Sequence, residues 1–291
     1  MEDRIVILAG GISSRMKRPQ EDLQNIDKRL VTEADEKSKS MIGVGKNYRP
    51  FLDYLIYNIR EAGYRNIVIV IGENDFAIKE KYGKKDRGNE FYGVDISYAI
   101  QTIPEGRSKP LGTADALLQA LRYQINWKGE QFTVCNSDNL YSVKALKLLS
   151  DSPYDNAFIE YDRSALNFPP ERIEGFAVTK KDGENFLVDI IEKPTPEEIE
   201  SVKTEDSRVG VSMNLFRFKY DMIFPYLENV PIDVKRGEKE LPNAVRMMIN
   251  DFPQSMYAHW ISEHVPDLTY KNDIINVQKY IESDYGDELF R

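Results

Sequence analysis

The chain has 291 residues, 41% of them hydrophobic, and a formal net charge of −9; it can bury a sizeable core, and its charge argues against nucleic acid or an anionic membrane as its main partner. Its single cysteine, Cys135, excludes an intrachain disulfide and a cysteine-cluster metal site. Residues 1–4 do not begin a signal peptide and no apolar run is long enough to cross a bilayer, so we expect a cytoplasmic protein.

In the first half of the chain, short apolar strands alternate with segments of helical periodicity, which is typical of a layered α/β fold. The expected strands are residues 5–8, 67–71, 96–100 and 132–135. The expected helices are residues 51–62, 76–82 and 113–123, the first of them ended by Gly63. Ligands of such sheets bind outside the carboxyl ends of the strands, so a site is predicted there.

The second half has shorter expected strands, near residues 157–161, 175–179, 186–191 and 210–218. Helical patterns at residues 222–227, 243–249 and 274–281 are expected to pack on this second half. The sequence contains no internal repeat. A chain of this length is commonly one α/β domain, so we predict a single domain over residues 1–291.

The first expected strand runs into a loop whose residue types suit phosphate binding. Gly10 and Gly11 have no Cβ to keep an oxyanion from the backbone. Ser13 and Ser14 add hydroxyl and N–H donors, and Arg15 adds a charged fork. A tight strand-to-helix turn uses the same residue types, so the spacing of later motifs has to decide between the two interpretations.

The loop sequence of residues 8–16, L-A-G-G-I-S-S-R-M, resembles the fingerprint of the sugar-1-phosphate nucleotidyltransferases, which make nucleoside diphosphate sugars. Later segments resemble motifs of the same family in the same order. They are Lys39-Ser40-Met41 with residues 43–45 and 50–52, Gln101 with Gly112-Thr113-Ala114, Asn136-Ser137-Asp138-Asn139, Glu192-Lys193-Pro194 and Leu241-Pro242-Asn243-Ala244. Together the matches cover roughly residues 5–250.

The resemblance implies a Rossmann-like, three-layer nucleotidyltransferase fold of the GT-A-like type, with a mixed central sheet and helices on both faces. It implies a nucleotide-binding half over about residues 1–138, and a sugar-phosphate-binding half with C-terminal helices over about residues 139–291. The implied partners are a nucleoside triphosphate and a sugar 1-phosphate, and the implied cofactor is Mg²⁺.

The family's functional residues can be carried over to matching positions. The implied catalytic residues are Arg15, Lys39 and Asp138. The two cations would bind the triphosphate, and the aspartate would bind the metal. The implied nucleotide-binding residues are Leu8, Ala9, Gly10, Gly11, Ser13, Ser14, Gln101, Gly112 and Thr113. The implied sugar-phosphate ligands are Gly175, Glu192 and Lys193. Asn243 stands where the family has a second acidic metal ligand, and its amide oxygen can coordinate without adding charge.

The implied reaction is attack of a sugar 1-phosphate on the α-phosphorus of the triphosphate, with release of pyrophosphate. A phosphate monoester has a second pKa of about 6, so it needs no strong protein base at neutral pH. It needs alignment of two anions and neutralisation of developing charge. Gln101 can read a pyrimidine edge and Gly112 leaves room for the base, which favours UTP or dTTP.

Two other functions stay open. A cytidylyltransferase for a small alcohol phosphate, such as phosphocholine, would share the phosphate loop and Asp138, although the triplet at residues 192–194 weighs against it. A non-catalytic protein that binds nucleotide sugars is compatible with the missing second aspartate. Pyrophosphate release distinguishes an enzyme from such a binding protein.

Residues 17–38 depart from the family pattern, because fewer residues separate the loop arginine from the following lysine in most relatives. The segment is highly charged and has few apolar residues, so we expect an exposed, mobile insertion. One interpretation is a solvated surface insertion. The other is a lid, because its two ends are tied to Arg15 and Lys39.

Overall fold

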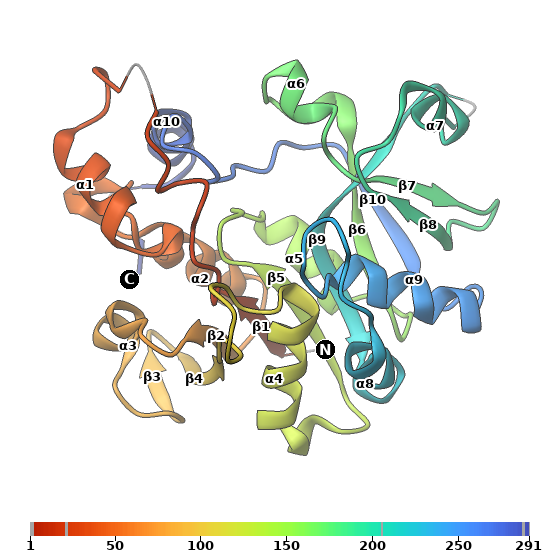
Figure 1. The fold of residues 1–291 in the computed structure, drawn as a ribbon, viewed down its shortest axis with the longest axis horizontal. Coiled ribbons are helices and arrows are strands. Elements are labelled where there is room, and N and C mark those ends of the chain that lie inside the picture. The colour runs from red at the N-terminus through yellow and green to blue at the C-terminus, as the bar shows by residue number, and fades with distance from the viewer. Residues whose placement is uncertain (1–2, 21–22, 205, 287–288, 291) are drawn as a thin grey trace.

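The computed structural model describes residues 3–20, 23–204, 206–286, 289 and 290 (Figure 1). The strands are β1 (Arg4–Leu8), β2 (Asn66–Gly72), β3 (Asn89–Phe91), β4 (Val94–Gln101), β5 (Gln131–Asn136), β6 (Ala157–Asp162), β7 (Val178–Lys181), β8 (Leu187–Ile191), β9 (Gly210–Lys219) and β10 (Tyr257–Ile261). The helices are α1 (Lys28–Glu36), α2 (Phe51–Glu61), α3 (Phe76–Tyr82), α4 (Thr113–Tyr123), α5 (Val143–Ser150), α6 (Pro170–Ile173), α7 (Pro196–Ser201), α8 (Tyr220–Asn229), α9 (Leu241–Asp251) and α10 (Asp273–Asp284). Short 3-10 turns cover Lys39–Met41, Lys46–Tyr48, Ile125–Trp127 and Arg163–Ala165.

One mixed sheet runs through the chain in the order β10-β6-β9-β5-β1-β2-β4-β3, and β7 joins β8 to β9 beside it. The strands β5, β1, β2 and β4 are mutually parallel along this path. The strand β9 is antiparallel to both β5 and β6, and β7 is antiparallel to β8. The carboxyl ends of β5, β1, β2 and β4 therefore share one edge of the sheet, as the sequence predicts.

Helices cover both faces of the sheet and complete three layers. The alternation of β1 sends Ile5 and Ile7 into a core shared with α2, α5 and α10. Val6 and Leu8 point into the opposite core, which is shared with α4, α8 and α9. Because every second residue of a strand faces the same side, a continuous apolar strand buries both faces.

The expected elements of the first half are confirmed within one or two residues at their ends. The helix α2 follows Pro50 and ends before Gly63, whose φ of +103° lies in the region that favours glycine. The short antiparallel strand β3 was not expected from the sequence.

The second half departs from expectation in several places. The strand expected from residue 175 begins only at Val178, because Gly175 and Phe176 donate backbone N–H bonds back to Arg172 and Ile173 at the end of α6. The helices α5, α6 and α7 and the strand β10 were also not expected.

The C-terminal helix packs elsewhere than expected. We expected it on the second half, but α10 buries its apolar residues in the same core as α2, and Figure 1 shows it beside α1. Tyr285, directly after α10, accepts a 2.6 Å hydrogen bond from Asn58 of α2. The helices α8 and α9 also pack against α4 of the first half. The C-terminal segment thus connects the two halves.

The insertion at residues 17–38 is more ordered than its composition indicates. Glu21 and Asp22 lie outside the described residues, but α1 occupies residues 28–36 with Leu30, Glu33 and Ala34 buried.

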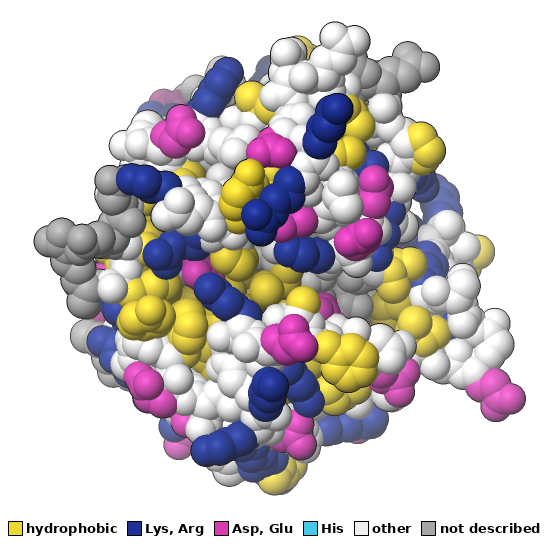
Figure 2. Space-filling model, turned by 90° about the vertical axis from the view of Figure 1, so that its left-hand side faces the viewer, with side chains coloured by type: hydrophobic (Ala, Val, Ile, Leu, Met, Phe, Trp, Pro, Cys, Tyr) yellow, Lys and Arg dark blue, Asp and Glu magenta, His cyan; other side chains and the backbone are white. Residues whose placement is uncertain are grey.

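In the part of the chain that the structure describes, no helix is long and apolar enough to cross a membrane. Figure 2 shows the face on the α1 and α3 side, where basic, acidic and hydrophobic side chains are interspersed.

Candidate functional site

The glycine-rich loop leaves the carboxyl end of β1 between the ends of two neighbouring strands. The Ala9 N–H donates to the Val70 carbonyl at 2.9 Å, and the Ser137 N–H donates to the Leu8 carbonyl at 3.2 Å. Gly11 is exposed, and a Cβ added to it would meet no atom within 4 Å. The backbone therefore faces open space at the point where the sequence predicts phosphate.

Three distant segments meet beside this loop. The Lys39 ammonium contacts the Asp138 carboxylate, with 2.7 Å between Nζ and Oδ2. The Lys39 backbone N–H donates to the Ser13 hydroxyl at 3.2 Å, and Ser13 has a left-handed φ of +57°. Ser14 and Arg15 are exposed on the same loop. Residues 13–15 and 39 follow β1 and residue 138 follows β5, and the parallel pairing of these two strands brings them together.

The charge of Asp138 is set by opposing effects. Burial alone would raise the pKa of this carboxyl group. The nearby Lys39 ammonium and, more weakly, the Arg15 guanidinium outweigh burial and hold the pKa of Asp138 below its usual value. Asp138 is therefore a carboxylate at neutral pH, with cations facing it.

A second carboxyl group, Asp267, lies close to Asp138, and it is not among the site residues predicted from the sequence. The Leu268 N–H donates to the Asp138 carbonyl at 2.9 Å, and the Asn139 amide donates to Asp267 at 3.1 Å. Burial and the negative charge of Asp138 raise the pKa of Asp267 to about 6. Two neighbouring carboxyl groups destabilise each other's charge unless a cation lies nearby.

Arg172 holds Asp267 in place. Its guanidinium bridges Asp267 and Asp273 at 2.6 Å each, so α6 is joined to the segment before α10. The signal that could have revealed Asp267 is its place after the mostly apolar run of β10, which pairs in parallel with β6. Like Asp138, Asp267 follows a strand of the same sheet.

The expected base-reading residues are engaged with the protein itself. The Gln101 amide nitrogen donates to the Gly112 carbonyl at 2.9 Å and to Asp115 at 2.8 Å. Its oxygen is directed towards Gly10, where an added Cβ would lie 2.8 Å from it. The Thr113 hydroxyl accepts the Leu241 N–H at 2.9 Å, at the first residue of α9.

The structure gives Gly112 a packing role, and its expected role beside the base stays a prediction. Its φ is +109°, and a Cβ would lie 2.6 Å from the Lys239 carbonyl oxygen. The space beside Gly112 is therefore occupied by the segment that precedes α9. Close approach of two backbone segments explains this glycine within the described fold.

The residues expected to bind the sugar phosphate lie after β8 and after α6. Glu192 is half-buried after β8, and its carboxylate lies 3.7 Å from the Arg236 guanidinium. Lys193 is exposed with a left-handed φ of +49°, and Gly175 is exposed after α6. Arg236 also contacts Glu240 at 2.5 Å and so lies between the carboxylates of Glu192 and Glu240. Arg236 is not among the site residues predicted from the sequence.

Asn243 occupies the first turn of α9, where its backbone N–H donates to the Glu240 carbonyl at 3.1 Å. The helix α9 packs against α4, α8 and β8. The carboxyl group that interacts electrostatically with Asp138 is Asp267. The assignment of Asn243 to the metal therefore stays a prediction, and the structure presents Asp267 as an acidic alternative.

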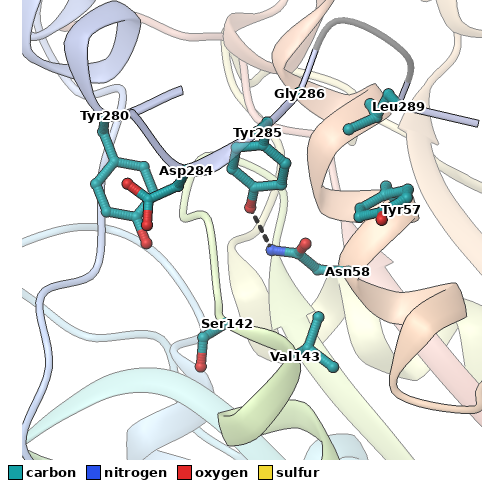
Figure 3. Close-up of a pocket in the computed structure, with 9 residues that line it drawn as sticks. All are labelled: Tyr57, Asn58, Ser142, Val143, Tyr280, Asp284, Tyr285, Gly286 and Leu289. Atoms are coloured by element: carbon teal, nitrogen blue, oxygen red, sulfur yellow. Dashed lines mark hydrogen bonds between the residues drawn. The ribbon is translucent and has the colours of Figure 1, made fainter. Parts of the chain in front are cut away.

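A cavity of about 270 Å³ lies away from the phosphate loop, between α2, the start of α5 and the segment after α10 (Figure 3). Tyr57, Tyr280 and Tyr285 line it together with the carboxylate of Asp284. Among the described residues that line it there is no lysine or arginine to bind a triphosphate.

The fold and the charged residues at the sheet edge define a three-layer α/β protein with a site suited to phosphate groups. A family model described as nucleotidyl transferase matches residues 28–283, and the chain belongs to this family. The family predicted from the sequence is thereby confirmed. The matched residues begin at α1, so the loop at residues 8–16 lies before them.

Two relatives by sequence carry names of sugar-nucleotide enzymes. The chain is 27% identical over 226 residues to glucose-1-phosphate adenylyltransferase 1 of Vibrio vulnificus, covering 76% of this chain and 50% of that protein. It is 27% identical over 253 residues to the bifunctional protein GlmU of Methanococcus vannielii, covering 87% of this chain and 52% of that protein. The chain thus spans about half the length of the curated relatives it matches.

Two solved structures share the fold over nearly the whole chain. A putative glucose-1-phosphate thymidylyltransferase from Bacillus anthracis, in complex with a sucrose, superposes with a TM-score of 0.66 at 17% identity, covering 99% of this chain and 98% of that one. A UDP-glucose pyrophosphorylase complexed with UDP-glucose gives a TM-score of 0.69 at 16% identity, covering 98% of this chain and 100% of that one. These likenesses confirm the predicted fold class.

Proposed function

We propose that the protein transfers a nucleotidyl group from a nucleoside triphosphate to a sugar 1-phosphate and releases pyrophosphate. The observation that carries this proposal is the meeting of Lys39, Asp138 and Asp267 beside an open glycine loop that ends on Arg15. Cations and carboxylates in one place suit a reaction between two phosphate anions. The names of the sequence relatives favour the same class of substrates.

The side chains divide the work by charge. Arg15 is exposed on the loop and binds the triphosphate, where its planar fork can contact two oxygens. Lys39 neutralises negative charge that develops as pyrophosphate leaves. The backbone at Gly10 and Gly11 and the serines of the loop orient the phosphates. The sugar phosphate is already a dianion at neutral pH, so its oxygen attacks phosphorus without a protein base.

The residues present fit a divalent cation. Asp138 and Asp267 are carboxyl groups that interact electrostatically, carboxylate oxygen is the donor type that Mg²⁺ prefers, and their repulsion favours a nearby cation. Mg²⁺ bound there would supply Lewis-acid neutralisation of phosphate oxygens. Lys39 pairs with Asp138 and so holds this carboxylate in its charged form.

The remaining residues select the substrates. Gln101 directs its amide oxygen towards the loop and can accept the imide N–H of uracil or thymine, which favours UTP or dTTP. Glu192 accepts hydrogen bonds from sugar hydroxyls, Lys193 meets the sugar phosphate, and Gly175 lets the backbone approach the sugar.

The test is pyrophosphate release from a substrate panel. The protein is incubated with Mg²⁺, one of UTP, dTTP, CTP or ATP, and either a sugar 1-phosphate or phosphocholine. We expect pyrophosphate only with a sugar 1-phosphate, and most with UTP or dTTP. Release with CTP and phosphocholine would support the cytidylyltransferase alternative. Nucleotide-sugar binding without pyrophosphate release in any mixture would support a non-catalytic binding protein.

A further inference from the structure

Glu33 is a buried carboxylate on α1, within the insertion that the family pattern does not explain. Its residue is only 6% exposed. One oxygen accepts the Gly43 N–H at 2.8 Å. The other oxygen lies 2.9 Å from the Lys37 ammonium and 3.3 Å from the Arg29 guanidinium. Each carboxylate oxygen therefore has its own partners.

These partners keep Glu33 charged. Burial alone would raise the pKa of Glu33, but Lys37, the Gly43 N–H and Arg29 together hold this pKa below its usual value. A buried carboxylate with such partners is a strong acceptor for a backbone N–H. The bond to Gly43 is therefore a firm connection between α1 and the next segment of the chain.

That next segment carries Lys39. Gly43 lies four residues after it, and Met41 and Ile42 between them are buried in the core. Gly43 itself is tightly placed, since a Cβ on it would lie 2.7 Å from the Tyr48 carbonyl oxygen. A shift of Gly43 would therefore be transmitted to Lys39 rather than absorbed.

A second contact joins α1 to the same segment. The Tyr48 hydroxyl donates to Asp27, the N-cap residue of α1, at 3.0 Å. The Arg29 guanidinium lies 3.6 Å from the centre of the Tyr48 ring. The inserted helix thus contacts residues 39–48 at two places, Gly43 and Tyr48. These contacts add to the burial of Met41 and Ile42 in the core.

We propose that Glu33 is a positioning residue that holds Lys39 against Asp138 by fixing the backbone at Gly43. Glu33 acts through Lys39, and the inference rests on the proposed function for its kinetic consequence. It assigns the insertion a role other than a solvated surface segment: α1 supports the placement of the cation that neutralises the triphosphate.

The test separates reach from charge at position 33. Glu33→Gln keeps the length and an oxygen that can accept the Gly43 N–H, but loses the charge. Glu33→Asp keeps the charge but is one methylene too short. Glu33→Ala removes both. Glu36→Ala, at an exposed position of the same helix, is the matched control. Asp35→Ala breaks the other anchor of α1, the ion pair with Lys271.

The first measurement is independent of activity: the rate of acetylation of Lys39 by limiting acetic anhydride, followed by peptide mass spectrometry. In the native protein this ammonium is paired and only 12% exposed at its side chain. We expect about a tenfold faster reaction in Glu33→Asp and Glu33→Ala, as for loss of one charge-assisted hydrogen bond, a smaller increase in Glu33→Gln, which keeps a neutral hydrogen bond, and a native rate in Glu36→Ala. Thermal melting checks that each variant is folded. If Glu33→Ala does not fold, Glu33→Asp alone tests the inference.

The second measurement is pyrophosphate release. We expect kcat to fall about tenfold in Glu33→Asp, with the KM for sugar phosphate within about twofold of the native value. Unchanged acetylation in Glu33→Asp, or the same increase in Asp35→Ala, would overturn the inference. Loss of protection in Glu33→Gln but not in Glu33→Asp would also overturn it, because charge and not reach would then matter. If the native protein releases no pyrophosphate but the acetylation pattern holds, the proposed function fails and the positioning role stands.

Discussion

The region proposed to bind the nucleotide, here the nucleotide end, and the region proposed to bind the sugar phosphate, here the sugar end, differ in strand topology. At the nucleotide end, loops leave β1, β2 and β5 at a common edge because these strands are parallel. At the sugar end, β7, β8 and β9 are antiparallel, so successive loops leave at opposite edges. Motif order therefore predicts convergence at the first end, where Lys39 meets Asp138. At the sugar end, motif order does not predict which residue lies beside Glu192.

The partners of two acidic residues illustrate this difference. Asp138 pairs with Lys39, which the family motifs already place in the site. Glu192 pairs with Arg236, which lies in the segment between α8 and α9. That segment is joined to the nucleotide end, because Lys109 donates to the Arg236 carbonyl at 2.7 Å and contacts Glu238 at 2.6 Å. The sugar end is thus built from loops that approach from both halves.

The largest expected effect is at the nucleotide end. Asp138→Asn should reduce pyrophosphate release about a thousandfold, the upper range for loss of one group that stabilises developing charge. The thermal melting temperature should change little, because the carboxylate supports the reaction more than the core. Full turnover by folded Asp138→Asn would remove Asp138 from the metal and the mechanism.

Replacing the cations should have the next largest effect. Lys39→Ala and Arg15→Ala should each slow pyrophosphate release by about 3 kcal/mol, or roughly a hundredfold. The affinity for sugar phosphate should change much less, since both residues are assigned to the triphosphate. Isothermal titration with sugar phosphate, beside the kinetics, checks this division. A variant that changes only this affinity would place its residue at the sugar end.

The two candidates for the second metal ligand lie on different elements, and their variants distinguish them. Asp267→Asn should weaken binding of Mn²⁺, used as a paramagnetic substitute for Mg²⁺, about tenfold or more. Asn243→Ala should leave this affinity within about twofold, because a neutral amide adds no charge. The reverse order would return the second ligand to Asn243 and to the motif that first indicated it.

A smaller effect is expected at the sugar end. Lys193→Ala should raise the KM for sugar phosphate about tenfold, the loss typical of one charge-assisted hydrogen bond. The KM for triphosphate should stay near the native value. Lys203, an exposed lysine that pairs with Glu200, provides a control substitution on the same side. An equal change in both KM values would show that the two ends are not separate.

Periodicity predicted most of the fold, because continuous apolar strands and helices such as α2 and α4 carry strong local signals. It missed α1, whose amphipathic residues are hidden among charges, and β10, whose partner β6 lies far away in sequence. The position of Asp267 after β10 is a signal in the sequence, but its contact with Asp138 could not be predicted from local pattern, because it depends on the return of the chain after β10. The role of Gly112 also depends on a distant segment.

The smallest expected effect concerns the insertion at residues 17–38. Its ends meet the nucleotide loop, while Lys271, before α10, contacts Asp35 and the Arg18 carbonyl. Cleavage of α1 requires local opening, because Leu30 is buried and cannot be exposed without breaking these contacts. In the proposed function Arg15 and Lys39 bind the triphosphate, so Mg²⁺ with the correct triphosphate would restrain both ends of the insertion and exclude water from the phosphates.

We therefore expect tryptic cleavage after Lys28 and Lys37 to slow about threefold when Mg²⁺ and triphosphate are added. Lys84 and Lys85, exposed between α3 and β3, provide an internal control whose cleavage should not change. Peptide mass spectrometry over a time course measures both sets of sites in one sample. Equal slowing at all sites would indicate global stabilisation by ligand. Unchanged cleavage of α1 would show that the insertion is not a lid that closes on the triphosphate, because its ordering would then be complete before substrate arrives.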